Sequence, residues 1–124
     1  MNKLPLFPRL PSLIGVVHLP ALPGSPRYSG KIGDARSVLR RDLQALKSGG
    51  AHGVILENFG DTPFLAGAAA PSTIASLTAL AAEARQLFPG PLGINLLRND
   101  GVGALAVAHA CLLYTSPSPR DATL

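Results

Sequence analysis

The chain has 124 residues, of which 47% are hydrophobic, and it contains 13 glycines and 12 prolines. This composition is typical of a globular domain with an apolar core, and it excludes a disordered or collagen-like chain. The net charge of +4 comes from scattered basic residues with few aromatic side chains between them, which argues against nucleic-acid binding.

One cysteine, Cys111, excludes an intramolecular disulfide framework and a cysteine-rich zinc site. Residues 1–12 are expected to be an N-terminal extension, because their prolines interrupt any apolar segment of a signal peptide. No run of residues approaches the roughly 18 apolar positions that span a bilayer. We therefore expect a cytoplasmic protein without a transmembrane span, and peripheral association with a membrane stays open.

The first half of the chain reads as strand, loop, helix and strand. Residues 14–19 form a short apolar run, which is typical of a strand buried on both faces. Asp34 is expected to cap a helix in which apolar residues recur every three or four positions until two glycines end it. Residues 53–58 then repeat the pattern of a buried strand.

The second half repeats this unit. A helix is predicted from near Ser72 to the Pro-Gly-Pro stop at residues 89–91, followed by a strand over residues 92–97. Asp100 is expected to cap a third helix over residues 102–110. The pattern predicts parallel, adjacent strands, as in a (β/α)8 barrel or a doubly wound sheet.

The loop after the first strand favours the barrel. Residues 18–28 contain neither a G-x-G-x-x-G turn nor a P-loop, so a dinucleotide-binding sheet or an NTPase has no support. The predicted fold class is α/β, with three β-α units of a TIM-type barrel in residues 13–110. Such a barrel takes roughly 250 residues, so the chain is expected to be an N-terminal fragment that is aggregation-prone and inactive by itself.

Polar side chains close all three predicted strands. In parallel α/β folds the carboxyl ends of the strands carry the chemistry, so these residues are expected to share one rim and to form a small-molecule site. They are His18 after the first strand, Glu57, Asn58 and Asp61 after the second, and Asn95, Arg98, Asn99 and Asp100 after the third.

Each of these residue types has both a functional and a structural interpretation. His18 can act as a general acid or base near neutral pH, or it can simply bond a neighbouring loop. Glu57 ends an apolar strand and needs a partner, for which Arg98 on the next strand is a candidate. The asparagines can hold a ligand's hydroxyl or carbonyl groups, or they can cap turns.

A divalent metal held by Glu57, Asp61 and Asp100 is an alternative that no ligand spacing marks, so the prediction includes no metal. The sequence also identifies no cofactor. His52 and His109 lie away from the expected rim, and structural or solvent-exposed roles are expected for both.

Three segments, residues 14–28, 53–64 and 91–100, carry phrases such as Glu-Asn-Phe-Gly-Asp and Leu-Arg-Asn-Asp in a familiar order and spacing. In these segments the chain resembles the BtpA/SgcQ family. The resemblance implies a ribulose-phosphate-binding type of TIM barrel and a role in biogenesis of membrane complexes such as photosystem I. The family's motif residues map onto the rim, with His18, Glu57 and Asp61 as catalytic candidates and Arg27, Asn58, Asn95, Arg98, Asn99 and Asp100 as ligand-binding candidates.

Two other functions stay open. One is a metabolic isomerase or lyase for a sugar-phosphate or nucleoside-like compound, with His18 or Glu57 as acid and base and Arg98 as an anion clamp. The other is an assembly factor without catalysis. In each case the full-length protein could be a homo-oligomer.

Residues 111–124 resemble no segment of the family. They read Cys-Leu-Leu-Tyr-Thr-Ser-Pro-Ser-Pro-Arg-Asp-Ala-Thr-Leu, which is similar to a translated transposase-type sequencing adapter. We expect this tail to be non-native and exclude it from the fold prediction.

Overall fold

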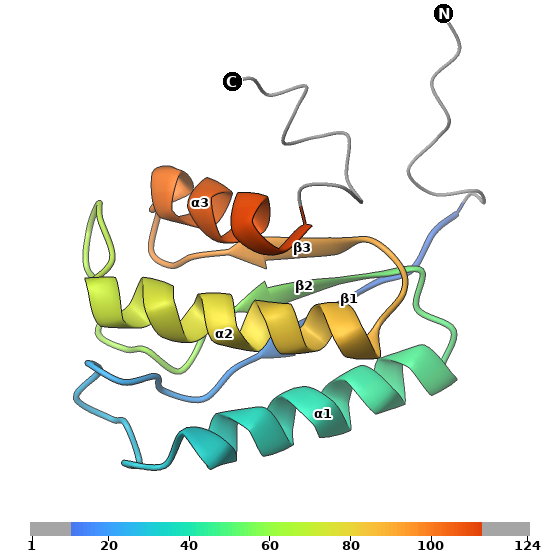
Figure 1. The fold of residues 1–124 in the computed structure, drawn as a ribbon, viewed down its shortest axis with the longest axis horizontal. Helices are drawn as coiled ribbons and strands as arrows, with labels where there is room; N and C mark the ends of the chain where they lie inside the picture. Colours follow the sequence, from blue (N-terminus) through green and yellow to red (C-terminus); the bar gives the residue numbers. More distant parts are fainter. Residues whose placement is uncertain (1–10, 113–124) are drawn as a thin grey trace, which may run out of the picture.

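The computed structural model describes residues 11–112, and these alternate between strands and helices (Figure 1). The elements are β1 (Ile14–His18), α1 (Ile32–Ser48), β2 (Gly53–Glu57), α2 (Pro71–Leu87), β3 (Leu92–Asn95) and α3 (Gly101–Leu112). The predicted β-α-β-α-β-α order is confirmed. Residues 1–10 of the expected extension and 113–124 of the expected tail lie outside the described residues.

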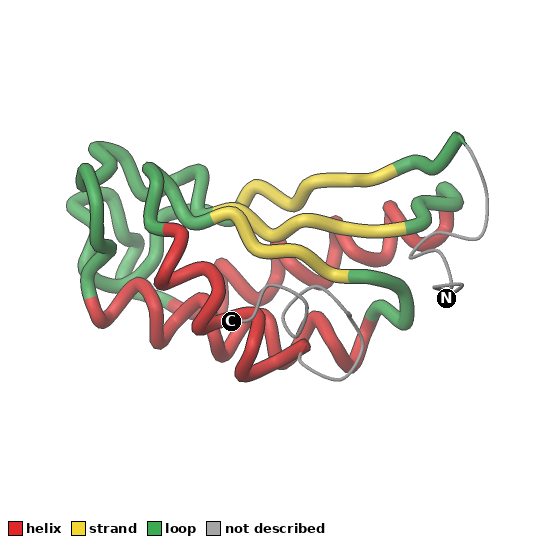
Figure 2. Tube along the Cα trace, turned by 90° about the horizontal axis from the view of Figure 1, so that it is seen from above, coloured by secondary structure: helices red, strands yellow, loops and turns green. Residues whose placement is uncertain are grey.

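The three strands form one parallel sheet in the order β1-β2-β3. All three helices lie on the same face of this sheet, as Figure 2 shows. A doubly wound sheet reverses its strand order and carries helices on both faces, whereas consecutive barrel units keep sequential order and one helical face. The α/β prediction is therefore confirmed for a three-stranded parallel sheet, which is fewer strands than a closed barrel contains.

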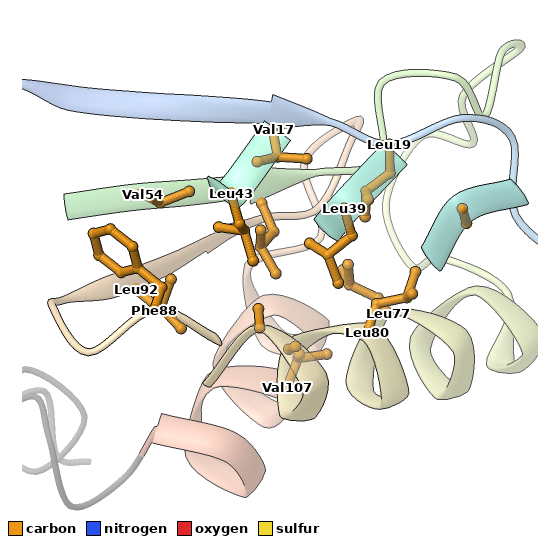
Figure 3. Packing of buried hydrophobic residues seen from close by; sticks show 14 of the residues in the cluster. Val17, Leu19, Leu39, Leu43, Val54, Leu77, Leu80, Phe88, Leu92 and Val107 are labelled. Carbon is orange, nitrogen blue, oxygen red and sulfur yellow. The ribbon is translucent and has the colours of Figure 1, made fainter. Parts of the chain in front are cut away.

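The apolar core lies between the sheet and the helices (Figure 3). Val17 and Leu56 on the strands and Leu39 and Leu77 on the helices are completely buried. Side chains alternate between the two faces of a strand, so every second strand residue enters this core. Burial of these leucines and valines drives the helices onto the sheet.

The opposite face of the sheet, which we call the open face, carries none of the helices in residues 11–112. Its apolar residues include Ile14 and Val16, which are 45% and 43% exposed. The expectation that the first strand is buried on both faces is therefore wrong for this chain. The apolar run is real, but the described residues supply a covering layer to one face alone.

The helix boundaries differ from the prediction where packing intervenes. Helix α1 begins at Ile32, with Lys31 as its N-cap, so the prediction of Asp34 as the cap is wrong. Ile32 packs against the core, which extends the helix toward its N-terminus. Asp34 lies in the first turn, where its negative charge favours the positive end of the helix dipole.

Helix α3 matches its predicted cap and exceeds its predicted length. The Gly103 amide donates to Asp100 Oδ1 at 2.7 Å, which confirms Asp100 as the cap. The helix continues to Leu112, two residues beyond the predicted end. No helix of the described residues is long and apolar enough to cross a membrane.

Candidate functional site

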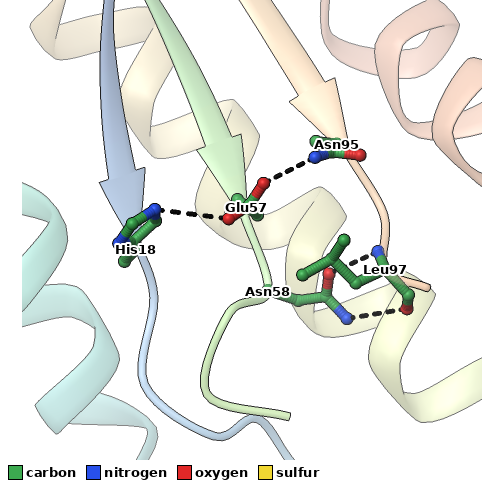
Figure 4. A network of polar contacts seen from close by, with 5 residues as sticks. All are labelled: His18, Glu57, Asn58, Asn95 and Leu97. Carbon is green, nitrogen blue, oxygen red and sulfur yellow. Dashed lines mark hydrogen bonds and ion pairs between the residues drawn. The ribbon is translucent and has the colours of Figure 1, made fainter. Parts of the chain in front are cut away.

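A polar row crosses the carboxyl end of the sheet on the open face (Figure 4). It consists of His18, Glu57 and Asn95, which are paired directly with one another in the parallel register. His18 Nε2 lies 3.3 Å from Glu57 Oε1, and Asn95 Nδ2 donates to Glu57 Oε2 at 2.5 Å. The structure thus brings together three of the predicted site residues, one from each strand.

Exposure differs along this polar row. The Glu57 side chain is 15% exposed at its centre, whereas the His18 side chain is 55% exposed at its edge. The apolar side chains of Val16 and Ile55 lie on the same face, two residues before the ends of their strands. A molecule bound on the open face would therefore contact the apolar side chains of Val16 and Ile55 and, at the ends of the strands, the polar row.

Phe59, which the sequence analysis did not single out, completes the surroundings of His18. Its ring stacks on the imidazole with centroids 4.4 Å apart and an interplanar angle of 17°. Such near-parallel contacts favour an offset arrangement of the rings. The signal available in the sequence was an aromatic residue placed directly after the polar Glu57-Asn58 pair, where it is half-exposed.

The polar row can perform acid-base chemistry. Glu57 accepts from Asn95 through one oxygen and faces His18 Nε2 with the other, so the carboxylate favours the tautomer with its proton on Nε2. This assignment follows from the partners. It leaves His18 Nδ1 as the nitrogen able to accept a proton from a ligand, and the carboxylate stabilises the imidazolium that results.

Asn58 and Asp61 belong to a different arrangement on the helix-covered side of the strand ends. Asn58 accepts from the Leu97 amide at 2.7 Å and donates to the Leu97 carbonyl at 3.2 Å. Asp61 accepts from the Leu22 amide at 2.6 Å and from Asn58 Nδ2 at 3.2 Å. Both side chains are buried, and together they tie the loops that follow the three strands.

Gly60 allows two of these loops to touch. Its amide donates to the Leu19 carbonyl at 2.9 Å. A Cβ at this position would lie 2.5 Å from the backbone nitrogen of Ala21, so a larger residue would push the loops apart.

Asn99 and Asp100 hold the long loop between β2 and α2. Asn99 Oδ1 accepts from the Gly67 amide at 3.0 Å, and Asp100 Oδ2 accepts from the Ala69 amide at 2.8 Å. The amides of Ala69 and Gly103, which donate to the Asp100 carboxylate, lower its pKa below the ordinary value. These two residues have structural partners in this loop.

The single predicted rim thus divides into two parts. Residues 57 and 58 are neighbours in the sequence, but successive side chains of a strand point to opposite faces. Glu57 therefore joins the polar row on the open face, whereas Asn58 joins the loop contacts on the covered side.

The two predicted arginines stand apart from both arrangements. Arg27 and Arg98 are exposed, and within residues 11–112 neither forms an ion pair with an acidic side chain. The expected Arg98–Glu57 pair is absent because Asn95 occupies the position opposite Glu57 in the register. Arg98 follows three residues later, beyond the end of β3.

The alternative of a shared metal site is not supported. In the part of the chain that the structure describes, no three histidine, cysteine or acidic side chains are placed to hold one metal ion. Asp61 and Asp100 instead accept hydrogen bonds from backbone amides. His52 accepts from the Leu13 amide at 2.8 Å, which is a structural role of the kind expected for it.

Several proteins are similar to this chain. A protein of Archaeoglobus fulgidus described as uncharacterized is 42% identical over 121 residues, which cover 88% of this chain and 47% of the relative. An uncharacterized protein of Thermococcus kodakarensis is 44% identical over 104 residues, which cover 84% and 39%. The photosystem I biogenesis protein BtpA of Synechocystis is 40% identical over 96 residues, which cover 77% and 33%.

The chain spans between a third and just under half of the length of these relatives. No solved structure matches it. The model of the BtpA family matches residues 9–112, a range that includes both the polar row and the loop contacts. The chain belongs to the BtpA family.

Proposed function

We propose that this chain forms three units of a (β/α)8 barrel and that its polar row is part of a small-molecule site inside that barrel. Three features support this proposal: the sequential strand order, the single helix-covered face and an open face with exposed isoleucine and valine side chains. The relatives have more than twice the matched length, which is enough chain for further units.

The proposed chemistry is proton transfer on a sugar-phosphate or nucleoside-like substrate, as in an isomerase or a lyase. The observation that carries it is the register-matched row in which Glu57 contacts both His18 and Asn95. His18 Nδ1 would take the proton, and Glu57 would stabilise the positive imidazolium. Asn95 Nδ2 donates a hydrogen bond to Glu57, and Asn95 Oδ1 would accept one from a substrate hydroxyl.

The exposed arginines fit a substrate that carries a phosphate. Arg98 follows β3 at the carboxyl end of the sheet, and Arg27 lies in the loop after β1. A guanidinium binds a phosphate through paired N–H groups, and neither arginine is engaged with an acidic side chain of the described residues.

A role in biogenesis of a membrane complex is the second candidate. The relative from Synechocystis that supports it is named a photosystem I biogenesis protein. In this case the barrel would act at the membrane surface by peripheral association, and the polar row would bind a ligand without turning it over.

One pair of variants separates the two candidates. In the complete protein that the gene encodes, His18→Ala and Glu57→Gln should abolish turnover of a sugar-phosphate substrate while circular dichroism stays unchanged. His109→Ala, a change of an exposed histidine on α3, is the matched control. Turnover that survives both variants would rule out the acid-base proposal. Unchanged accumulation of photosystem I in a strain complemented with either variant would show that the biogenesis role needs no catalysis.

A further inference from the structure

A pocket of about 230 Å³ lies on the helix-covered side of the strand ends. It is formed by the loop after β1, the loop after β2 and the start of α2. Four polar side chains line it. Asn58, Asp61 and Thr73 are each at least nine-tenths buried, and Ser25 is partly buried. The polar row is on the other face of the sheet, so this pocket is not part of the proposed substrate site.

Asp61 gives the pocket an unbalanced charge. Each of its carboxylate oxygens accepts one hydrogen bond, from the Leu22 amide and from Asn58 Nδ2, and both donors are neutral. A carboxylate accepts about four hydrogen bonds, so each oxygen keeps capacity for another donor. No lysine or arginine among residues 11–112 forms an ion pair with it.

A buried carboxylate without a cation is costly, because desolvation removes water that would otherwise satisfy its charge. A ligand that donates a hydrogen bond into the pocket offsets this cost. An anionic ligand would add to it, since like charges repel strongly in a partly dry environment. The charge of Asp61 therefore favours a donor group, either an ammonium or a hydroxyl.

The rest of the lining favours a short apolar body. Pro63, Phe64, Leu65 and Leu97 form much of the wall. Drug-sized ligands occupy sites of roughly 300–1,000 Å³, so a pocket of about 230 Å³ suits a smaller molecule.

We propose that this pocket binds a small amine or alcohol whose donor group meets Asp61 and whose apolar body lies against Phe64 and Leu97. The site goes beyond the proposed function, because it uses none of the three residues of the polar row.

The test uses three probes with the same branched four-carbon skeleton: isobutylamine, isobutanol and isobutyrate. Each is titrated into the complete protein, and the backbone amide signals of Leu22 and of the non-proline residues in 58–73 are followed by NMR. We expect isobutylamine to bind and isobutyrate not to bind. Isobutanol binding as tightly as isobutylamine would show that a neutral donor is sufficient, whereas weaker binding would identify the ammonium as the favoured donor.

Two variants locate the binding. Asp61→Asn should weaken isobutylamine binding about tenfold, which corresponds to about 1.4 kcal/mol, because a charge-assisted hydrogen bond is lost. Ala70→Leu should block binding of isobutylamine and isobutanol by filling the pocket, and Ala82→Leu on the exposed side of α2 is its matched control.

Three results would overturn the proposal. They are isobutyrate binding as tightly as isobutylamine, isobutylamine affinity unchanged by both Asp61→Asn and Ala70→Leu, or no binding of either donor probe to the unaltered protein. A Glu57→Gln variant alters the polar row and leaves the pocket lining intact. Binding of isobutylamine to this variant therefore tests the pocket independently of the proposed acid-base function.

Discussion

The two faces of the sheet carry similar kinds of residues, but these residues are buried on one face and exposed on the other. On the helix-covered face, Val17 is fully buried, and the polar side chain of Asn58 is occupied by backbone partners. On the open face, Val16 is 43% exposed, and His18, whose side chain is 55% exposed, contacts Glu57 through Nε2. The covered face is part of the apolar core, whereas the open face has exposed apolar side chains next to polar ones.

The largest expected effect on the free energy of unfolding comes from a comparison of two adjacent valines, Val16 and Val17. Val17→Ala should lower the free energy of unfolding by about 2 kcal/mol, because it removes two buried carbons and leaves a cavity. Val16→Ala should cost less than about 1 kcal/mol in this chain, because its side chain is already partly in water. Urea denaturation of the two variants measures the difference.

The same pair tests closure of the barrel. In the complete protein, further strands would cover Val16, and its replacement by alanine should then cost about as much as that of Val17. A Val16→Ala variant that stays nearly neutral in the complete protein would show that the open face is not buried there.

A second comparison concerns two asparagines at strand ends. Asn58→Ala should destabilise the fold by about 1–2 kcal/mol, because it leaves the partly buried Leu97 backbone groups without their partner. Asn95→Ala removes a single contact on the open face, and we expect less than about 0.5 kcal/mol. Equal losses in urea unfolding would contradict the division between loop contacts and polar row.

Asp100 should make the fold sensitive to acid. Its pKa in the folded chain is lower than the ordinary 3.8, because the amides of Ala69 and Gly103 donate to the carboxylate. The stabilisation is therefore complete above about pH 4 and is lost as the pH falls through the lower folded pKa. Asp100→Asn should reduce the difference in urea midpoint between pH 7 and pH 3, whereas Asp34→Asn in the first turn of α1 serves as a control.

The sequence predicted the elements because their periodicity survives folding. Buried strands and amphipathic helices each show a local hydrophobic pattern in the sequence. The predicted bounds of all six elements therefore lie within a few residues of the observed ones. The start of α1 was missed because Ile32 packs against the core, and no local signal reports a tertiary contact of this kind.

The sequence singled out His18, Glu57 and Asn95, which the structure brings together, but it did not predict how these side chains are arranged. The alternation of side chains along a strand was sufficient to separate Glu57 from Asn58, but both were assigned to one rim. The Glu57–Asn95 contact required the register between β2 and β3, which no local pattern reveals. The pocket beside Asp61 also needed the relative placement of two long loops.

The smallest expected effect concerns Phe59, whose ring stacks on His18 from an exposed position. Phe59→Leu should change stability by no more than about 0.5 kcal/mol, because little buried area is lost. Under the proposed acid-base function it should nevertheless lower kcat of the complete protein several-fold, since the imidazole plane that directs Nε2 toward Glu57 is then less restricted. Phe59→Tyr retains the stacked ring and should restore kcat. If leucine and tyrosine gave the same kcat as phenylalanine, stacking would have no part in orienting His18, and the contact with Glu57 alone would hold the imidazole.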